Sequence, residues 1–213
     1  MICTSISGCN VDEAMRRAAK ADIAEIRLDL IDGITQSGAK KIFSSRKGLV
    51  AACRPGKMDE KKRLSILLAS IEAGATYVDV EVNGSDKYKQ EVATAAKKKG
   101  CTLIVSYHNY EKTPVRAELD QIVRWCFESG AYMAKIACKA NSKKDCARLL
   151  GLLEGDKKMI VVGMGEKGRI TRIVAPLLGS VFTFASQAKG KETAPGQMEK
   201  DALEKAMKAV TNG

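Results

Sequence analysis

The chain has 213 residues, of which 45% are hydrophobic and 29% charged, and its formal net charge at pH 7 is +11. This length supports one large core or two small ones, and because no low-complexity stretch or obvious linker divides the sequence, we expect one domain over residues 1–213. No apolar run approaches the length of a membrane span, so we expect no membrane-spanning helix. The first expected strand starts at Ile2 with no targeting pattern before it, so we expect a soluble, cytoplasmic protein with no membrane partner.

The net charge of +11 would suit a nucleic-acid partner, a membrane surface or an anionic substrate. The lysines, however, are spread along expected helices such as 95–99 and 142–145 and do not gather in one basic arm. Solvated helix faces are the better interpretation. The aromatic residues are scattered and form no base-stacking platform, so we expect no nucleic-acid partner.

The chain has 7 cysteines, an odd number with no Cys-x-x-Cys pair, and a single histidine. Most of the cysteines fall in apolar segments, so we interpret them as reduced, buried small hydrophobes. One histidine without clustered thiols cannot supply a zinc site. A carboxylate magnesium site stays open, but no spacing supports it, and we expect no metal.

Apolar segments of strand length alternate with amphipathic segments of helical length through the whole chain. The expected strands start near Ile2, Ile23, Leu49, Tyr77, Cys101, Tyr132, Lys158 and Val181. The expected helices span 11–21, 38–46, 59–73, 86–99, 116–129, 142–154, 169–178 and 199–210. Eight parallel strands, each followed by a helix, predict an α/β fold of the (β/α)8 TIM-barrel type.

A doubly wound open sheet is the alternative fold. No Gly-x-Gly-x-x-Gly follows the first expected strand, and Gly163-Met-Gly-Glu-Lys-Gly168 after the seventh is a weak match that better suits a loop at the barrel mouth. In both folds, ligands bind at the carboxyl ends of the strands.

One lysine, Lys135, lies inside the apolar run Tyr132-Met-Ala-Lys-Ile-Ala-Cys138, where burying an ammonium is costly. The preceding expected strand ends on His108, the only histidine. A lysine that can shed its proton beside a group that titrates near neutrality suggests covalent amine catalysis on a carbonyl. A snorkelling lysine and a structural histidine are the alternatives.

Other polar residues also occupy strand ends. Alternation places Glu25, Arg27 and Asp29 on one face of their strand, and likewise Asp79 and Glu81, while Arg54 closes the third strand. These groups could form a charge ladder in which Lys135 neutralises Glu25 or Glu81. Because polar groups from five strands converge on one mouth, a site for a polar, anionic small molecule is favoured.

Several short motifs occur in the order and at the spacings of a known family. They are Glu25-Ile-Arg27-Leu-Asp29, Ser106-Tyr-His-Asn-Tyr-Glu-Lys-Thr-Pro114, Lys135-Ile-Ala137, Met164-Gly165 with Arg172, and Thr193-Ala-Pro-Gly-Gln197. Together they resemble type I 3-dehydroquinate dehydratases, and the resemblance extends from Ser5 to Gln197.

The resemblance implies a lyase of the shikimate pathway that converts the small molecule 3-dehydroquinate to 3-dehydroshikimate without metal or organic cofactor. Lys135 matches the Schiff-base lysine, which attacks the substrate ketone once its amine is neutral. His108 matches the general base that removes a proton next to the imine and returns it to the departing hydroxyl. One residue can serve both steps because elimination in this family is syn.

The remaining matches are substrate contacts. Arg172 matches the arginine that grips the substrate carboxylate, a task suited to a planar guanidinium. Polar contacts and apolar walls complete the set: Glu25, Arg27 and Arg54 orient hydroxyls and the catalytic pair, Ser5 adds a contact, Thr193 and Gln197 belong to a closing loop, and Met164 and Phe184 are walls.

The chain departs from the family pattern at three places. Asn109 follows the histidine where an aspartate is common, and Met58 stands where a glutamate is common, so the acid that orients His108 is left open. The loop before Thr193, residues 187–192, is about two residues longer than usual.

Two rival functions remain. A class I aldolase would share the barrel and the lysine, but it should show a second glycine-rich phosphate cup where Thr193-Ala-Pro-Gly-Gln197 stands. A basic RNA-binding module would explain only the charge. Dimers are frequent in the resembled family, so a homodimer is an option with no interface indicated.

Overall fold

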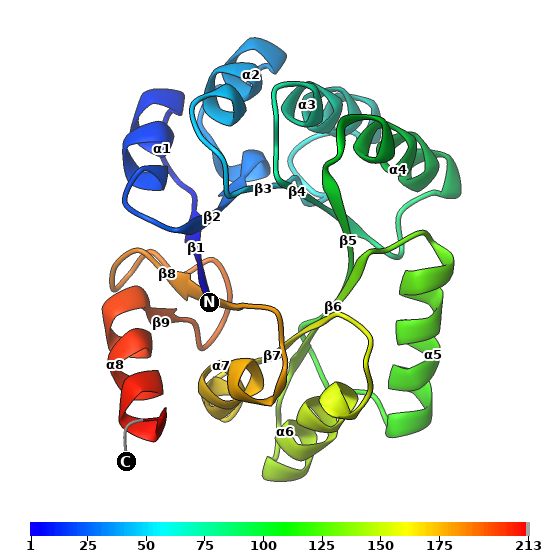
Figure 1. The fold of residues 1–213 in the computed structure, drawn as a ribbon, viewed down its shortest axis with the longest axis vertical. Coiled ribbons are helices and arrows are strands. Elements are labelled where there is room, and N and C mark those ends of the chain that lie inside the picture. Colours follow the sequence, from blue (N-terminus) through cyan, green and yellow to red (C-terminus); the bar gives the residue numbers. More distant parts are fainter. Residues whose placement is uncertain (212–213) are drawn as a thin grey trace.

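The computed structural model describes residues 1–211, in which strands and helices alternate from end to end (Figure 1). The strands are β1 (Ile2–Ile6), β2 (Ile23–Arg27), β3 (Leu49–Ala52), β4 (Tyr77–Glu81), β5 (Thr102–Asn109), β6 (Met133–Lys139), β7 (Met159–Met164), β8 (Thr183–Ser186) and β9 (Met198–Glu199). The helices are α1 (Val11–Ala18), α2 (Gln36–Ser44), α3 (Glu60–Glu72), α4 (Asp86–Lys99), α5 (Arg116–Glu128), α6 (Lys143–Leu150), α7 (Arg169–Val174) and α8 (Lys200–Thr211). Three 3-10 turns are η1 (Leu28–Leu30), η2 (Gly151–Glu154) and η3 (Ala175–Leu178).

The strands pair in parallel in the order β7-β6-β5-β4-β3-β2-β1-β8-β9, and the helices surround them (Figure 1). The ring closes between β7 and β8 through single contacts: the Val181 N–H donates to the Met159 carbonyl at 2.9 Å, and the Ser180 hydroxyl accepts from the Val161 N–H at 3.2 Å. The predicted (β/α)8 fold is confirmed.

Local sequence explains where elements start and stop. Ser142 and Asp145 form a reciprocal capping box at the start of α6, as side chains at a helix N-terminus do when they satisfy its free N–H groups. The helix expected over 169–178 ends early, because Pro176 has no N–H to donate and the last turn becomes η3. The helix expected over 142–154 likewise ends in the 3-10 turn η2. The short strand β9 was not predicted.

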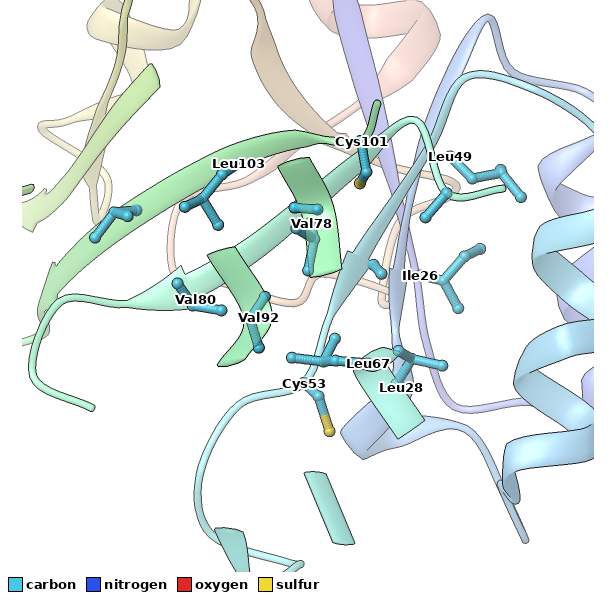
Figure 2. Close-up of a cluster of buried hydrophobic side chains, with 14 of the residues drawn as sticks. Ile26, Leu28, Leu49, Cys53, Leu67, Val78, Val80, Val92, Cys101 and Leu103 are labelled. Carbon is cyan, nitrogen blue, oxygen red and sulfur yellow. The ribbon is translucent and has the colours of Figure 1, made fainter. Parts of the chain in front are cut away.

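Buried apolar side chains form two layers. The outer layer lies between the strands and helices and includes Ile26, Leu67, Val78 and Leu103 (Figure 2). The inner layer fills the barrel with side chains of alternate strand positions: Cys3, Ile23, Val50, Ile104, Met133, Ile160, Phe182 and Phe184. Apolar side chains therefore fill the barrel interior, and the polar groups lie at the carboxyl-terminal ends of the strands.

The cysteines are buried and unpaired, as the sequence predicted. Within residues 1–211, no helix is both long and apolar enough to cross a membrane.

Candidate active site

A cavity opens at the carboxyl ends of the strands, and the structure brings all the predicted site residues to it. Its polar lining is Ser5, Glu25, Arg27, Arg54, His108, Lys135, Arg172, Thr193 and Gln197. Met164 and Phe184 form part of its apolar wall, as expected, together with Tyr110, Ala137, Val162 and Ala194.

Lys135 projects from β6 into the cavity and is 4% exposed. Its Nζ lies 3.0 Å from Asp79 Oδ2, 3.4 Å from Glu25 Oε2 and 4.0 Å from the centre of the Phe184 ring. The sequence analysis considered Glu25 and Glu81 as acidic partners of Lys135. In the structure Glu25 is a partner, and Asp79 is the second partner in place of Glu81. Two carboxylates thus flank an amine that would otherwise be an unpaired buried charge.

Asp79 has a role that the sequence did not predict, although alternation placed it among the polar groups at the barrel mouth. Both of its carboxylate oxygens accept from Arg54, at 2.9 and 2.6 Å, and the Ser106 hydroxyl donates to Oδ1 at 2.6 Å. Burial alone would raise the pKa of Asp79, but the charges of Arg54 and Lys135 hold that pKa well below its usual range. The available signal was strand alternation, which puts Asp79 on the same face as Glu81.

The imidazole of His108 contacts Glu81 on β4 and not an acid from its own loop. Its Nδ1 lies 3.0 Å from Glu81 Oε1, and Arg54 Nη1 lies 2.9 Å from that same oxygen. Burial and then the charge of Arg54 lower the pKa of His108, and they outweigh the raising effect of Glu81. The imidazole therefore favours its neutral form, which can accept a proton.

Two of the three departures from the family pattern, Asn109 and Met58, do not contact the imidazole in the structure. The Asn109 side chain turns to its own loop, where Oδ1 accepts the N–H groups of Glu111 and Lys112 at 3.0 and 2.9 Å. Met58 packs against the outer core. Neither position contributes an acid, and Glu81 alone contacts the imidazole among the acidic side chains of residues 1–211.

Arg172, on α7, is a buried cation without an acidic partner in the described chain. Its Nη1 donates to the Phe184 carbonyl at 3.1 Å and its Nη2 to the Pro195 carbonyl at 3.4 Å, while Nε is buried without a partner. Burial and then the charge of Arg169 lower the pKa of Arg172 to about 10. An anionic ligand would relieve this unbalanced charge.

Arg27 is held at the mouth by a neighbour in the chain. Its Nε and Nη2 donate to the two oxygens of Asp29 at 3.1 and 2.7 Å, and Asp29 also accepts the backbone N–H of Arg54 at 3.1 Å. This pairing leaves Asp29 to position two arginines rather than to face the cavity.

The loop over residues 187–197, called the lid loop below, covers one side of the cavity. The Gly165 N–H donates to the Pro195 carbonyl at 2.9 Å. Gly196 has φ of 72°, and a Cβ there would lie 2.2 Å from the Gly165 carbonyl oxygen, so only glycine permits this approach. Within the loop, Gln197 Oε1 accepts the Thr193 N–H at 2.7 Å.

Comparison with known proteins identifies the family of the chain. The model of the type I 3-dehydroquinase family matches residues 2–213. The chain belongs to this family. It is 35% identical to the 3-dehydroquinate dehydratase of Methanocaldococcus jannaschii, over 95% of this chain and 96% of that one. It is 36% identical to that of Methanococcus vannielii, over 99% and 100%.

Solved structures agree with the fold. The 3-dehydroquinate dehydratase of Aquifex aeolicus matches with a TM-score of 0.82 and 27% identity, covering 98% of each chain. The type I enzyme of Clostridium difficile, solved with covalent modified comenic acid, matches with a TM-score of 0.87 and 24% identity, over 99% of this chain and 92% of that one. The family model and the two methanogen relatives identify the chain as a hydro-lyase of the type I dehydroquinase family rather than a class I aldolase.

Proposed function

We propose that the chain dehydrates 3-dehydroquinate to 3-dehydroshikimate by syn elimination through a Schiff base on Lys135, with His108 as general acid and base. The observation that carries this proposal is the convergence of Lys135, His108 and Arg172 on one cavity.

Arg172 binds the substrate carboxylate, because a buried guanidinium with an unpartnered Nε gains a charge-assisted partner there. Arg27 and Arg54, held by Asp29 and Asp79, are fixed donors for substrate hydroxyls. The planar substrate carboxylate and its ring hydroxyls therefore set one orientation of the ketone toward Lys135.

The Lys135 amine gives up a proton and attacks the ketone carbon, and the carbinolamine loses water to leave a protonated imine. Asp79 and Glu25 flank this cationic nitrogen and stabilise it. His108 takes a proton from the carbon next to the imine, and the electron pair moves into the imine. That proton goes to the departing hydroxyl as the double bond forms, and hydrolysis of the imine frees product and lysine.

Glu81 supports both roles of His108. A neutral imidazole that donates from Nδ1–H to Glu81 presents the Nε2 lone pair to the cavity, where a substrate proton would lie.

No group of three or more His, Cys, Asp or Glu side chains among residues 1–211 is placed to hold a metal ion. The absence of cofactors and of a nucleic-acid partner, a cytoplasmic location and the option of a homodimer remain predictions.

The direct test is to follow the conjugated double bond of the product by ultraviolet absorbance after adding 3-dehydroquinate to purified protein. Turnover should be unchanged after exhaustive chelation, because the protonated imine is the electron sink. Loss of activity that zinc or magnesium restores would contradict the proposed chemistry.

A further inference from the structure

A continuous chain of hydrogen bonds connects the lid loop to Lys135. Gln197 Nε2 donates to Ser5 Oγ at 3.2 Å, Ser5 Oγ donates to Glu25 Oε1 at 2.9 Å, and Glu25 Oε2 lies 3.4 Å from Lys135 Nζ. All four side chains are buried. Ser5 and Glu25 are directly paired across the β1–β2 ladder, so the middle link is set by the register of the barrel.

The direction of this chain is fixed at the lid end. Because the Thr193 N–H donates to Gln197 Oε1, that atom is the amide oxygen, and the Gln197 NH2 must face Ser5. A hydroxyl has one proton to donate. When the Ser5 oxygen accepts from Gln197, its own proton is left for Glu25.

The two carboxylates at Lys135 differ in what holds them. Asp79 is held by Arg54 and Ser106, and within residues 1–211 neither of these side chains hydrogen-bonds to the lid loop. Glu25 Oε1 is held by Ser5, and Ser5 by Gln197 of the lid loop. Only Glu25 can therefore respond to the position of the lid.

We propose that Ser5 is a positioning residue that couples docking of the lid loop to the placement of Glu25 beside the Lys135 amine. With the lid docked, the Ser5 proton points at Glu25 and keeps this carboxylate against Nζ. With the lid undocked, Ser5 is free to rotate, and the nearby charges of Arg27 and Arg54 compete for Glu25. Resting on the proposed role of Lys135, this coupling brings the second negative charge to the imine nitrogen when the cavity is closed.

Coupling is reciprocal, so a change at the lysine end must also loosen the lid. This can be measured without substrate, by the initial rate of trypsin cleavage after Lys189 and Lys191, which are exposed in the lid loop. Ser5→Ala should raise this rate about threefold to tenfold, the effect of losing one hydrogen bond. Glu25→Gln, which keeps the side-chain shape but loses the charge, should raise it as well.

Ser106→Ala is the matched control. It removes another buried serine hydroxyl from a carboxylate at Lys135, but Ser106 serves Asp79 and is not part of the chain to the lid. Its cleavage rate should equal that of the wild type. The coupling would be overturned if Ser5→Ala and Glu25→Gln were cleaved by trypsin at the same rate as Ser106→Ala and the wild type, with melting curves that show folded protein.

A double-mutant cycle gives a second measurement. Ser5→Ala and Gln197→Met should each lower kcat more than they raise KM, and the double variant should be no slower than the slower single one, because both interrupt the same chain. Additive losses confined to KM would mean that Ser5 and Gln197 contact substrate independently. If the proposed Schiff-base reaction is wrong, borohydride will trap no imine in the wild type. The proteolysis result does not depend on that outcome, because it is measured without substrate.

Discussion

His108 Nδ1 and Glu81 Oε1 lie 3.0 Å apart across the β4–β5 ladder. This contact determines which imidazole nitrogen faces the cavity, and it connects the histidine to Arg54, whose Nη1 lies 2.9 Å from the same oxygen. The imidazole is thus oriented by an anion and kept neutral by a nearby cation and by burial. A group that must take and then return a proton requires both conditions.

Replacing Glu81 with glutamine should lower kcat by about tenfold to a hundredfold, the effect of losing a hydrogen bond to a charged group. Glu81 raises the pKa of His108, so its loss should also move the acid limb of kcat/KM to lower pH. Steady-state kinetics across pH would measure both. Glu72→Gln, at an exposed position on α3, is a control that should match the wild type. Wild-type kinetics for Glu81→Gln would show that catalysis does not depend on the contact between Glu81 and His108.

The wild-type pH profile has a defined sign. Burial and the charge of Arg54 lower the pKa of His108 below 6.5, so the neutral base persists below that pH. The acid limb of kcat/KM should lie below pH 6.5 and fall as pH drops through the folded-state pKa. The same group contributes stability that is present above its unfolded pKa and lost as pH falls through the folded one. An acid limb at higher pH would assign the titration to another group.

The sequence predicted the residues of the site better than their pairing. Lys135 stands out in an apolar strand, and alternation puts Asp79 and Glu81 on one face, because both signals are local. Which acid meets which cation depends on barrel curvature and inter-strand register, which alternation does not contain. In the structure Asp79, and not Glu81, is the second acid beside Lys135. Glu81 is the acid that contacts His108, a partner that the sequence left open. The β7–β8 closure and β9 also depend on contacts between distant segments.

Asp79→Asn should destabilise the fold strongly, since it removes the charge that balances buried Arg54 and Lys135. Breaking a buried pair of this kind costs about 3 to 5 kcal/mol in free energy of unfolding. The urea midpoint measures the loss. As a control, Asp12→Asn breaks the exposed pair with Lys41 and should leave the midpoint near that of the wild type. A small effect for Asp79→Asn would indicate that Glu25 and Glu81 balance the cations without it.

Arg172→Ala should raise KM by about tenfold to a hundredfold with little change in kcat, because the carboxylate contact is a charged hydrogen bond made in ground and transition states alike. Arg169→Ala, an exposed arginine on the same helix, is the matched control and should change KM little. Comparable KM values for Arg172→Ala and the wild type would remove this arginine from the binding site.

The Schiff base itself is tested at Lys135. Borohydride added during turnover should reduce the imine to a stable secondary amine and inactivate the protein irreversibly. Mass spectrometry should then find one ligand on the peptide that carries Lys135 and no comparable label elsewhere, because exposed lysines are almost wholly protonated at neutral pH and are poor nucleophiles. Lys135→Ala should lose both labelling and turnover yet still bind the substrate carboxylate through Arg172. Labelling at another lysine, or turnover by Lys135→Ala, would overturn the mechanism.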